Sequence, residues 1–188
     1  GVVRRNISLE TLNGDKVASR TRGGSLAYTR AGLDAAWNAG FRGTKLNAVL
    51  LGGVNADEIP ALAQLAQDGK YEVRFIELML SGECADWPRE RFLSADAVLH
   101  ALPELQRLPN EGVAERYRMP GWKGKIGLIR PMSHRFCADC DRIRVTADGR
   151  LKPCLHSAQA IPLRGLHGEN LERALREGMF GKPVRHHM

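Results

Sequence analysis

The fold class follows from two stretches of sequence, Thr44-Lys-Leu-Asn-Ala-Val-Leu-Leu51 and Tyr71-Glu-Val-Arg-Phe-Ile-Glu-Leu78. Each predicts a β-strand, and residues 56–68 between them predict a helix. Pro60 is tolerated only in the first turn of a helix, which favours Asp57 as the N-cap. A strand, a helix and a strand in this order predict parallel strands joined by a right-handed crossover.

The same pattern extends upstream. Residues 2–9 predict a strand, a polar turn follows at Asn13-Gly14, and residues 25–38 predict a helix. The first 80 residues therefore predict the order β-α-β-α-β. We place a domain boundary near residue 80, which gives domains 1–80 and 81–188. The second domain combines a polar loop at 81–92, a helix at 95–106, strands at 114–119 and 123–129, a hairpin rich in cysteine and arginine, and a helix near 170–177.

Composition limits the protein class. The 188 residues are 43% hydrophobic, enough for one sizeable core. The net charge of +7 fits nucleic acid, nucleotide phosphates or simple solubility. No apolar run approaches the roughly 20 residues that cross a bilayer, and no signal peptide opens the chain. Four cysteines in such a chain favour metal or redox chemistry. The chain begins with Gly1 inside a strand pattern, so we expect further sequence upstream.

Polar side chains share one face of each predicted parallel strand. They are Arg4, Asn6 and Ser8, then Lys45 and Asn47, then Arg74 and Glu77. Parallel strands are normally apolar on both faces, and burying an unpaired polar group costs roughly 1–3 kcal/mol. We therefore expect these groups to line a solvated cavity at the carboxyl ends of the strands. The alternative is an open sheet with a solvated edge. If Arg74 and Met79 both face the cavity, Met79 must lie beyond its strand.

Three cysteines surround one predicted hairpin. Cys137 and Cys140 are spaced to hold one metal centre, and Cys154 follows downstream. Asp148-Gly149 between them predicts a two-residue type I′ turn. The hairpin would bring Cys154 back to the neighbourhood of Cys140.

That turn sets a register for the hairpin. It places Ile143 opposite Cys154 and predicts that Arg142, Arg144 and Thr146 share one face. Two guanidinium groups beside a metal loop suit phosphate or purine recognition. The alternative is that both arginines simply face solvent.

The spacing of the cysteines alone does not identify the metal. Three thiolates leave a tetrahedral zinc one ligand short, and His134, His156 or Asp141 could supply the fourth. An iron–sulfur cubane on three cysteines would leave one iron free for substrate. Three buried thiols without metal are the remaining reading. Cys84 stands alone in a loop and is taken as a bystander.

Several segments together resemble the MoaA-type GTP 3′,8-cyclase family of radical S-adenosylmethionine enzymes. They are Asn6-Ile-Ser-Leu-Glu-Thr-Leu, Lys45-Leu-Asn-Ala-Val, Gly53-Val-Asn-Ala-Asp-Glu-Ile, Arg74-Phe-Ile-Glu-Leu-Met79, Ser133-His-Arg-Phe-Cys-Ala-Asp-Cys-Asp-Arg-Ile-Arg and Leu151-Lys-Pro-Cys-Leu. The resemblance runs from end to end of the chain. It implies the last three βα units of an incomplete (βα)6 TIM-type barrel, followed by a C-terminal extension whose hairpin carries an iron–sulfur cluster.

The resemblance also implies site residues. Cys137, Cys140 and Cys154 match the ligands of the family's second 4Fe–4S cluster. GTP-binding or substrate-pocket positions match Lys45, Arg74, Arg142 and Arg144, and positions that contact S-adenosylmethionine match Ser8 and Met79. The implied activity is the radical conversion of GTP to (8S)-3′,8-cyclo-7,8-dihydroguanosine 5′-triphosphate in molybdenum cofactor biosynthesis. The resemblance further implies a cytoplasmic enzyme that receives electrons from a donor such as flavodoxin or ferredoxin. A homodimer is one possible oligomeric state, and neither a membrane nor a nucleic acid is expected as a partner.

The chain departs from the family pattern in ways that matter for activity. The family's first cluster needs Cys-x-x-x-Cys-x-x-Cys, whereas the cysteines here lie at 84, 137, 140 and 154. The family's terminal Gly-Gly is absent, and the chain stops at His187-Met188. We therefore expect a fragment lacking both ends, which does not cleave S-adenosylmethionine alone.

Other functions fit parts of the pattern. A zinc-binding module that grips nucleic acid would use the hairpin and the positive charge, although the aromatic content is only 6% and offers few stacking groups. Another radical enzyme with an auxiliary cluster would share the cysteines. A degenerate homologue would bind GTP without catalysis.

Overall fold

The computed structural model describes residues 5–137, 140, 142–157 and 159–182. These divide into two compact units, Gly1–His134 and Arg135–Met188, each with its own fold. The predicted boundary near residue 80 follows the sequence pattern and stays a prediction. Arg4, which we placed on the polar face of the first strand, lies outside the described residues.

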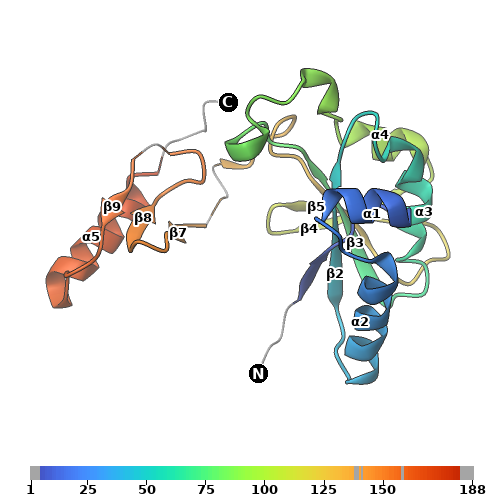
Figure 1. Ribbon diagram of the computed structural model, residues 1–188, viewed down its shortest axis with the longest axis horizontal. Coiled ribbons are helices and arrows are strands. Elements are labelled where there is room, and N and C mark those ends of the chain that lie inside the picture. The colour runs from blue at the N-terminus through green and yellow to red at the C-terminus, as the bar shows by residue number, and fades with distance from the viewer. Residues whose placement is uncertain (1–4, 138–139, 141, 158, 183–188) are drawn as a thin grey trace. The chain divides into compact units, whose positions relative to one another are not determined.

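The first unit is built on a six-stranded sheet. Its order is β1 (Asn6–Ser8), β2 (Thr44–Leu50), β3 (Tyr71–Glu77), β6 (Ile126–Ile129), β5 (Ala114–Arg118) and β4 (Gln106–Glu111). The first four strands run parallel, and β5 and β4 are antiparallel to their neighbours (Figure 1). The three predicted parallel strands are thus confirmed as part of an α/β sheet.

Helices cover one face of this sheet. They are α1 (Gly14–Arg20), α2 (Leu26–Asn38), α3 (Ile59–Gln64) and α4 (Asp96–Ala101), with short 3-10 turns η1 (Ala56–Glu58), η2 (Gly82–Cys84) and η3 (Arg89–Arg91). The buried core joins strand residues such as Leu46 and Phe75 to helix residues such as Leu33, Leu62 and Val98. Figure 1 shows the helices on one side of the sheet. The opposite face therefore carries the alternate, polar positions of the strands.

Capping explains where the helices begin and where prediction failed. The Ser25 side chain accepts a hydrogen bond at the start of α2, so the helix predicted at 25–38 begins one residue later, at Leu26. Asn13 caps α1, a helix where we expected only a turn. The Asp57 N-cap is wrong, because α3 begins after Glu58. Asn55 is buried and instead bonds three backbone groups around the end of β2.

Glu77 corrects the prediction for the polar face. Arg74 and Glu77 lie an odd number of residues apart on β3, so they point to opposite faces. Glu77 is 1% exposed on the helix-covered side. Its carboxylate accepts hydrogen bonds from the backbone of Ala95, Met132 and Ser133. It fastens the core rather than lining a cavity.

The predicted helix at 95–106 is shorter in the structure. Its helix α4 ends at Ala101, and β4 begins at Gln106. Pro103 lies between them and disfavours helical backbone in the residue before it. The antiparallel strand β4 was not predicted.

The second unit is a small antiparallel sheet with one helix. It contains β7 (Arg144–Val145), β8 (Arg150–Lys152), β9 (Ile161–Pro162) and α5 (Gly168–Phe180). Leu151 is fully buried, and a Cβ added to Gly178 of α5 would lie 2.2 Å from its Cδ2 atom. The glycine lets α5 pack directly on β8.

The hairpin turn differs from the prediction by one residue. Val145 pairs with Leu151, and the Thr146 amide donates to the Arg150 carbonyl at 2.9 Å. The loop therefore has three residues and ends at Gly149, whose φ is 78°. This is a glycine bulge rather than a type I′ turn. The predicted pairing of Ile143 with Cys154 is wrong, since the observed register moves each partner by one.

Candidate functional site

A row of polar side chains crosses the uncovered face of the first sheet. The register pairs Asn6, Lys45 and Glu72 on one level, and Ser8, Asn47, Arg74, Gly127 and Arg116 on the next. The structure thus brings Ser8, Lys45 and Arg74 onto one face, as the alternation predicted.

Ion pairs connect the charged members of this face. Glu72 accepts a hydrogen bond from Arg74 Nε at 2.6 Å and lies 3.9 Å from Lys45 Nζ. Lys45 also pairs with Glu111 at 3.0 Å, and Glu111 in turn pairs with Arg116. The side chains of Lys45, Arg74 and Arg116 are only 13–16% exposed. Charges this poorly hydrated need close partners, and here carboxylates supply them.

Electrostatics fixes the state of the central carboxylate. The hydrogen bond from Lys45 lowers the pKa of Glu111 below its ordinary value, and the charges of Arg116 and Arg74 lower the pKa further. Glu111 is therefore ionised at neutral pH. Within this set of ion pairs, the three cations Lys45, Arg74 and Arg116 exceed the two carboxylates by one positive charge.

Met79 and Ser8 differ in their exposure to solvent and in their position relative to the strands. Ser8 is exposed on β1, and Met79 is half-buried just after β3. Met79 lies in the loop, which is where the sequence argument required it. The Ser81 amide donates to the Met79 carbonyl at 2.8 Å and makes this loop turn.

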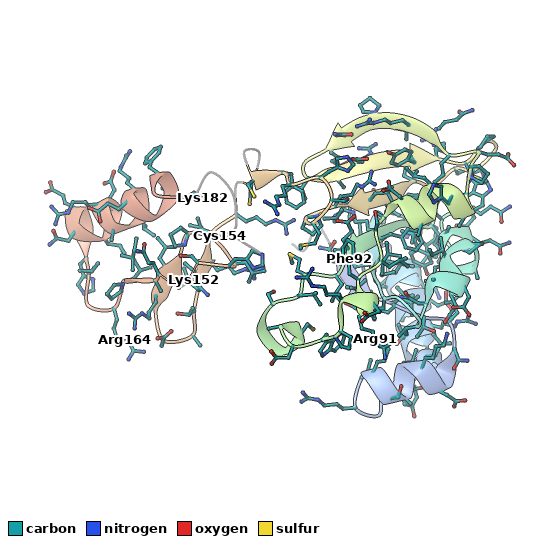
Figure 2. The ribbon with its side chains drawn as sticks, turned by 90° about the horizontal axis from the view of Figure 1, so that it is seen from above. Arg91, Phe92, Lys152, Cys154, Arg164 and Lys182 are labelled. Carbon is teal, nitrogen blue, oxygen red and sulfur yellow. The ribbon has the colours of Figure 1, made fainter. Side chains whose placement is uncertain are left out.

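The three cysteines all belong to the second unit. Cys137, Cys140 and Cys154 are free and half-buried. The Cys140 amide donates to the Cys137 carbonyl at 3.3 Å, and Lys182 Nζ donates to the Cys140 carbonyl at 2.7 Å. Figure 2 labels Cys154 and Lys182, which follow β8 and α5.

The donor set fits an iron–sulfur cluster chemically. Three thiolates alone would suit a cubane with one open iron, whereas structural zinc would need a fourth ligand such as His134, His156 or Asp141. Within the described residues, no three cysteine, histidine or carboxylate side chains are gathered closely enough to hold a metal ion. The ligand assignment therefore stays a prediction from the resemblance.

The arginines of the hairpin lie on an exposed basic face. Arg142 and Arg144 are both exposed, and Arg144 pairs across the hairpin with Lys152. Like charges directly opposite each other on a sheet repel, so this face is suited to an anion. Lys152 was missed from the sequence, because the predicted register gave Arg144 a different partner.

Three residues of the polar face were also missed. Glu72 carried a signal, since it shares the alternation of Arg74 on one strand. Arg116 lies on a predicted strand, but nothing in the sequence told us which strand it would pair with. Glu111 belongs to β4, a strand we did not predict.

Comparison with known proteins identifies a family and several relatives with similar sequences. The family described as Molybdenum Cofactor Synthesis C matches residues 71–188. The GTP 3′,8-cyclase of Alkaliphilus oremlandii is 41% identical over 191 residues, which covers 99% of this chain and 60% of the relative. The GTP 3′,8-cyclase of Peptoclostridium acidaminophilum is 44% identical, over 99% of this chain and 59% of the relative.

A third GTP 3′,8-cyclase, from Pseudomonas entomophila, is 40% identical over the whole chain and 60% of the relative. The chain thus spans about 60% of the length of the curated relatives that it matches. No helix in the described residues has the length and apolar character needed to cross a membrane. On the match over residues 71–188, the chain belongs to the molybdenum cofactor synthesis C family.

Proposed function

We propose that this chain is the substrate-binding portion of a GTP 3′,8-cyclase that acts in molybdenum cofactor biosynthesis. The observation that carries the proposal is the polar sheet face, where Lys45 and Arg74 lie on neighbouring strands one level apart. The relatives of similar sequence named above are GTP 3′,8-cyclases. Cations of this kind suit the triphosphate of a nucleotide.

Each group of residues has a role in this proposal. Lys45 and Arg74 neutralise and orient phosphate oxygens, and Arg142 and Arg144 supply further anion and purine contacts. Ser8 and Met79 contact S-adenosylmethionine, which together with a first cluster would supply the radical when bound. The contribution of these protein residues is to hold GTP and S-adenosylmethionine in the correct relative position, which is catalysis by positioning.

The second unit would hold the other cofactor. Cys137, Cys140 and Cys154 are proposed to bind a 4Fe–4S cluster, and Lys182 supports the backbone of Cys140 through its 2.7 Å hydrogen bond. We further propose the barrel architecture implied by the resemblance for the sheet, and a cluster-bearing role for the hairpin. An electron donor such as flavodoxin or ferredoxin, a homodimer and a cytoplasmic location stay predictions. The comparisons do not favour the zinc-binding nucleic-acid module.

GTP binding tests the proposal directly. We expect the reconstituted chain to bind GTP in titration calorimetry, and Arg74→Gln to weaken binding by about tenfold, the effect of losing one charge-assisted contact. Arg107→Gln is the matched control, because Arg107 is exposed on β4 and pairs with Tyr117 on the helix-covered side. Equal affinities for Arg74→Gln and Arg107→Gln would contradict the role of the polar face.

A further inference from the structure

Gly127 separates two arginines on the polar face. The register places it between Arg74 on β3 and Arg116 on β5. A Cβ added to Gly127 would lie 3.1 Å from Arg74 Cγ and 3.7 Å from the Cβ of Ala114. The missing side chain therefore lets Arg74 lie close over β6, and the two neighbouring strands each present an arginine beside Gly127.

Arg116 has unused hydrogen-bonding capacity on this face. Its side chain is 15% exposed, and Glu111 is its ion-pair partner. In the described part of the chain, its Nε atom is buried without a hydrogen-bond partner. An unpaired buried donor costs about 1–3 kcal/mol. On the same face, in β2, the Asn47 Oδ1 atom is also buried and unpaired in the described part of the chain, so polar atoms of two strands lack partners.

The Glu111 carboxylate lies among three cations, where the phosphate of a ligand would also bind. It bonds Lys45 Nζ at 3.0 Å and pairs with Arg116, and the charge of Arg74 acts on it as well. Its side chain is 47% exposed, far more than those of its partners. A carboxylate and a phosphate present similar oxygen pairs to a guanidinium. A phosphate group could therefore replace this carboxylate without rearranging the cations.

We infer that Lys45, Arg74 and Arg116 form a polyphosphate subsite, with Arg116 as a further substrate-binding residue and the Glu111 carboxylate as an internal competitor. The inference rests on the proposed function for the nature of its ligand, the triphosphate of a nucleotide. Binding exchanges one carboxylate for a polyanion on the same three cations. Until substrate arrives, Glu111 keeps Lys45 and Arg116 paired, and Glu72 pairs with Arg74.

Inorganic triphosphate tests the subsite without the base or the sugar. In titration calorimetry on the 188-residue chain, Glu111→Gln should tighten triphosphate binding several-fold, because the competitor loses its charge. Arg116→Gln should weaken binding by about tenfold. Arg116→Lys keeps the charge and should retain most of the affinity, provided that its thermal unfolding matches the wild type.

Matched controls separate local from general charge effects. Glu104→Gln removes a negative charge from an exposed position, and Arg107→Gln removes a positive charge from the other face. The inference is overturned if Glu111→Gln behaves like Glu104→Gln, or Arg116→Gln like Arg107→Gln. Triphosphate binding with the expected pattern but no preference for GTP would support the subsite and count against GTP as substrate. GTP binding that is indifferent to both substitutions would leave the proposed function standing and refute the subsite.

Discussion

Replacing Glu77 by glutamine should destabilise the first unit strongly, although the two side chains have nearly the same shape. Glu77 Oε2 accepts hydrogen bonds from the amides of Met132 and Ser133 at 3.0 and 2.9 Å. Its Oε1 atom accepts from the Ala95 amide at 3.1 Å and from the Ser133 hydroxyl. The carboxylate thereby joins the end of β3 to the start of α4 and to the turn after β6.

The magnitude follows from the donors that glutamine cannot serve. If the amide oxygen takes Met132 and Ser133, the amide nitrogen faces the backbone N–H of Ala95. The Ser133 hydroxyl can rotate and accept, but the Ala95 amide cannot. One buried donor is left unpaired, which costs about 1–3 kcal/mol, and the remaining bonds lose the assistance of a full charge. We expect a loss of about 2–3 kcal/mol.

Thermal unfolding and hydrogen exchange check this estimate. For a unit of this size, the loss corresponds to a fall of roughly 6–15 °C in Tm. Exchange protection should fall most at the amides of Ala95, Met132 and Ser133. Glu104→Gln, at an exposed position, is the control. A change below about 0.5 kcal/mol, typical of surface substitutions, would refute the reasoning.

Three further substitutions probe packing, charge and the site. Gly178→Ala should loosen the second unit, because the new Cβ would lie 2.2 Å from Leu151 Cδ2; limited proteolysis should then release α5 early, and unchanged resistance would contradict the packing. Burial raises the pKa of Glu58, but the hydrogen bonds it accepts outweigh this and hold the pKa below 4.5. The ionised Glu58 carboxylate therefore stabilises the folded state fully above pH 4.5, and this stabilisation is lost as the pH falls through the lowered pKa. Acid should consequently lower the Tm of Glu58→Gln less than that of the wild type, and parallel curves of Tm against pH would refute this. Gly127→Ala should push Arg74 aside and weaken triphosphate binding several-fold while Tm changes little; unaltered binding would exclude a need for Arg74 to lie close over Gly127.

Local pattern predicted the parallel part of the fold well. Thr44–Leu50 and Tyr71–Glu77 are strands because apolar residues recur on one face, and the observed alternation of buried and half-buried positions follows that pattern. The helix predicted at 25–38 is also present, as α2 at Leu26–Asn38. These features depend on neighbours in the chain, which is why the sequence reports them.

Long-range pairing was beyond the sequence. Strand β4 contains Pro109 and is largely exposed, so no apolar alternation announces it. Without β4, neither the position of Glu111 nor its pairing with Lys45 could be foreseen. Glu77 was misplaced for a different reason, since its charge suggested solvent while its hydrogen bonds hold it in the core.

In the hairpin, one extra loop residue changes which side chains face each other across the two strands. Asp148-Gly149 favours a two-residue turn, but the Thr146 hydroxyl bonds the Arg150 amide at 3.1 Å and also pairs with Asp148. These side-chain bonds stabilise the three-residue loop. The register then pairs Arg144 with Lys152, a basic pair that the predicted register concealed.

Iron and sulfide analysis after anaerobic reconstitution tests the central claim most directly. If this chain is the cluster-bearing, substrate-binding portion of a GTP 3′,8-cyclase, it should hold about four irons and four sulfides. Cys137→Ala should lose them, whereas Cys84→Ala, which changes a lone cysteine in η2, should keep them. One zinc and no sulfide, or the same iron content in both variants, would contradict the account.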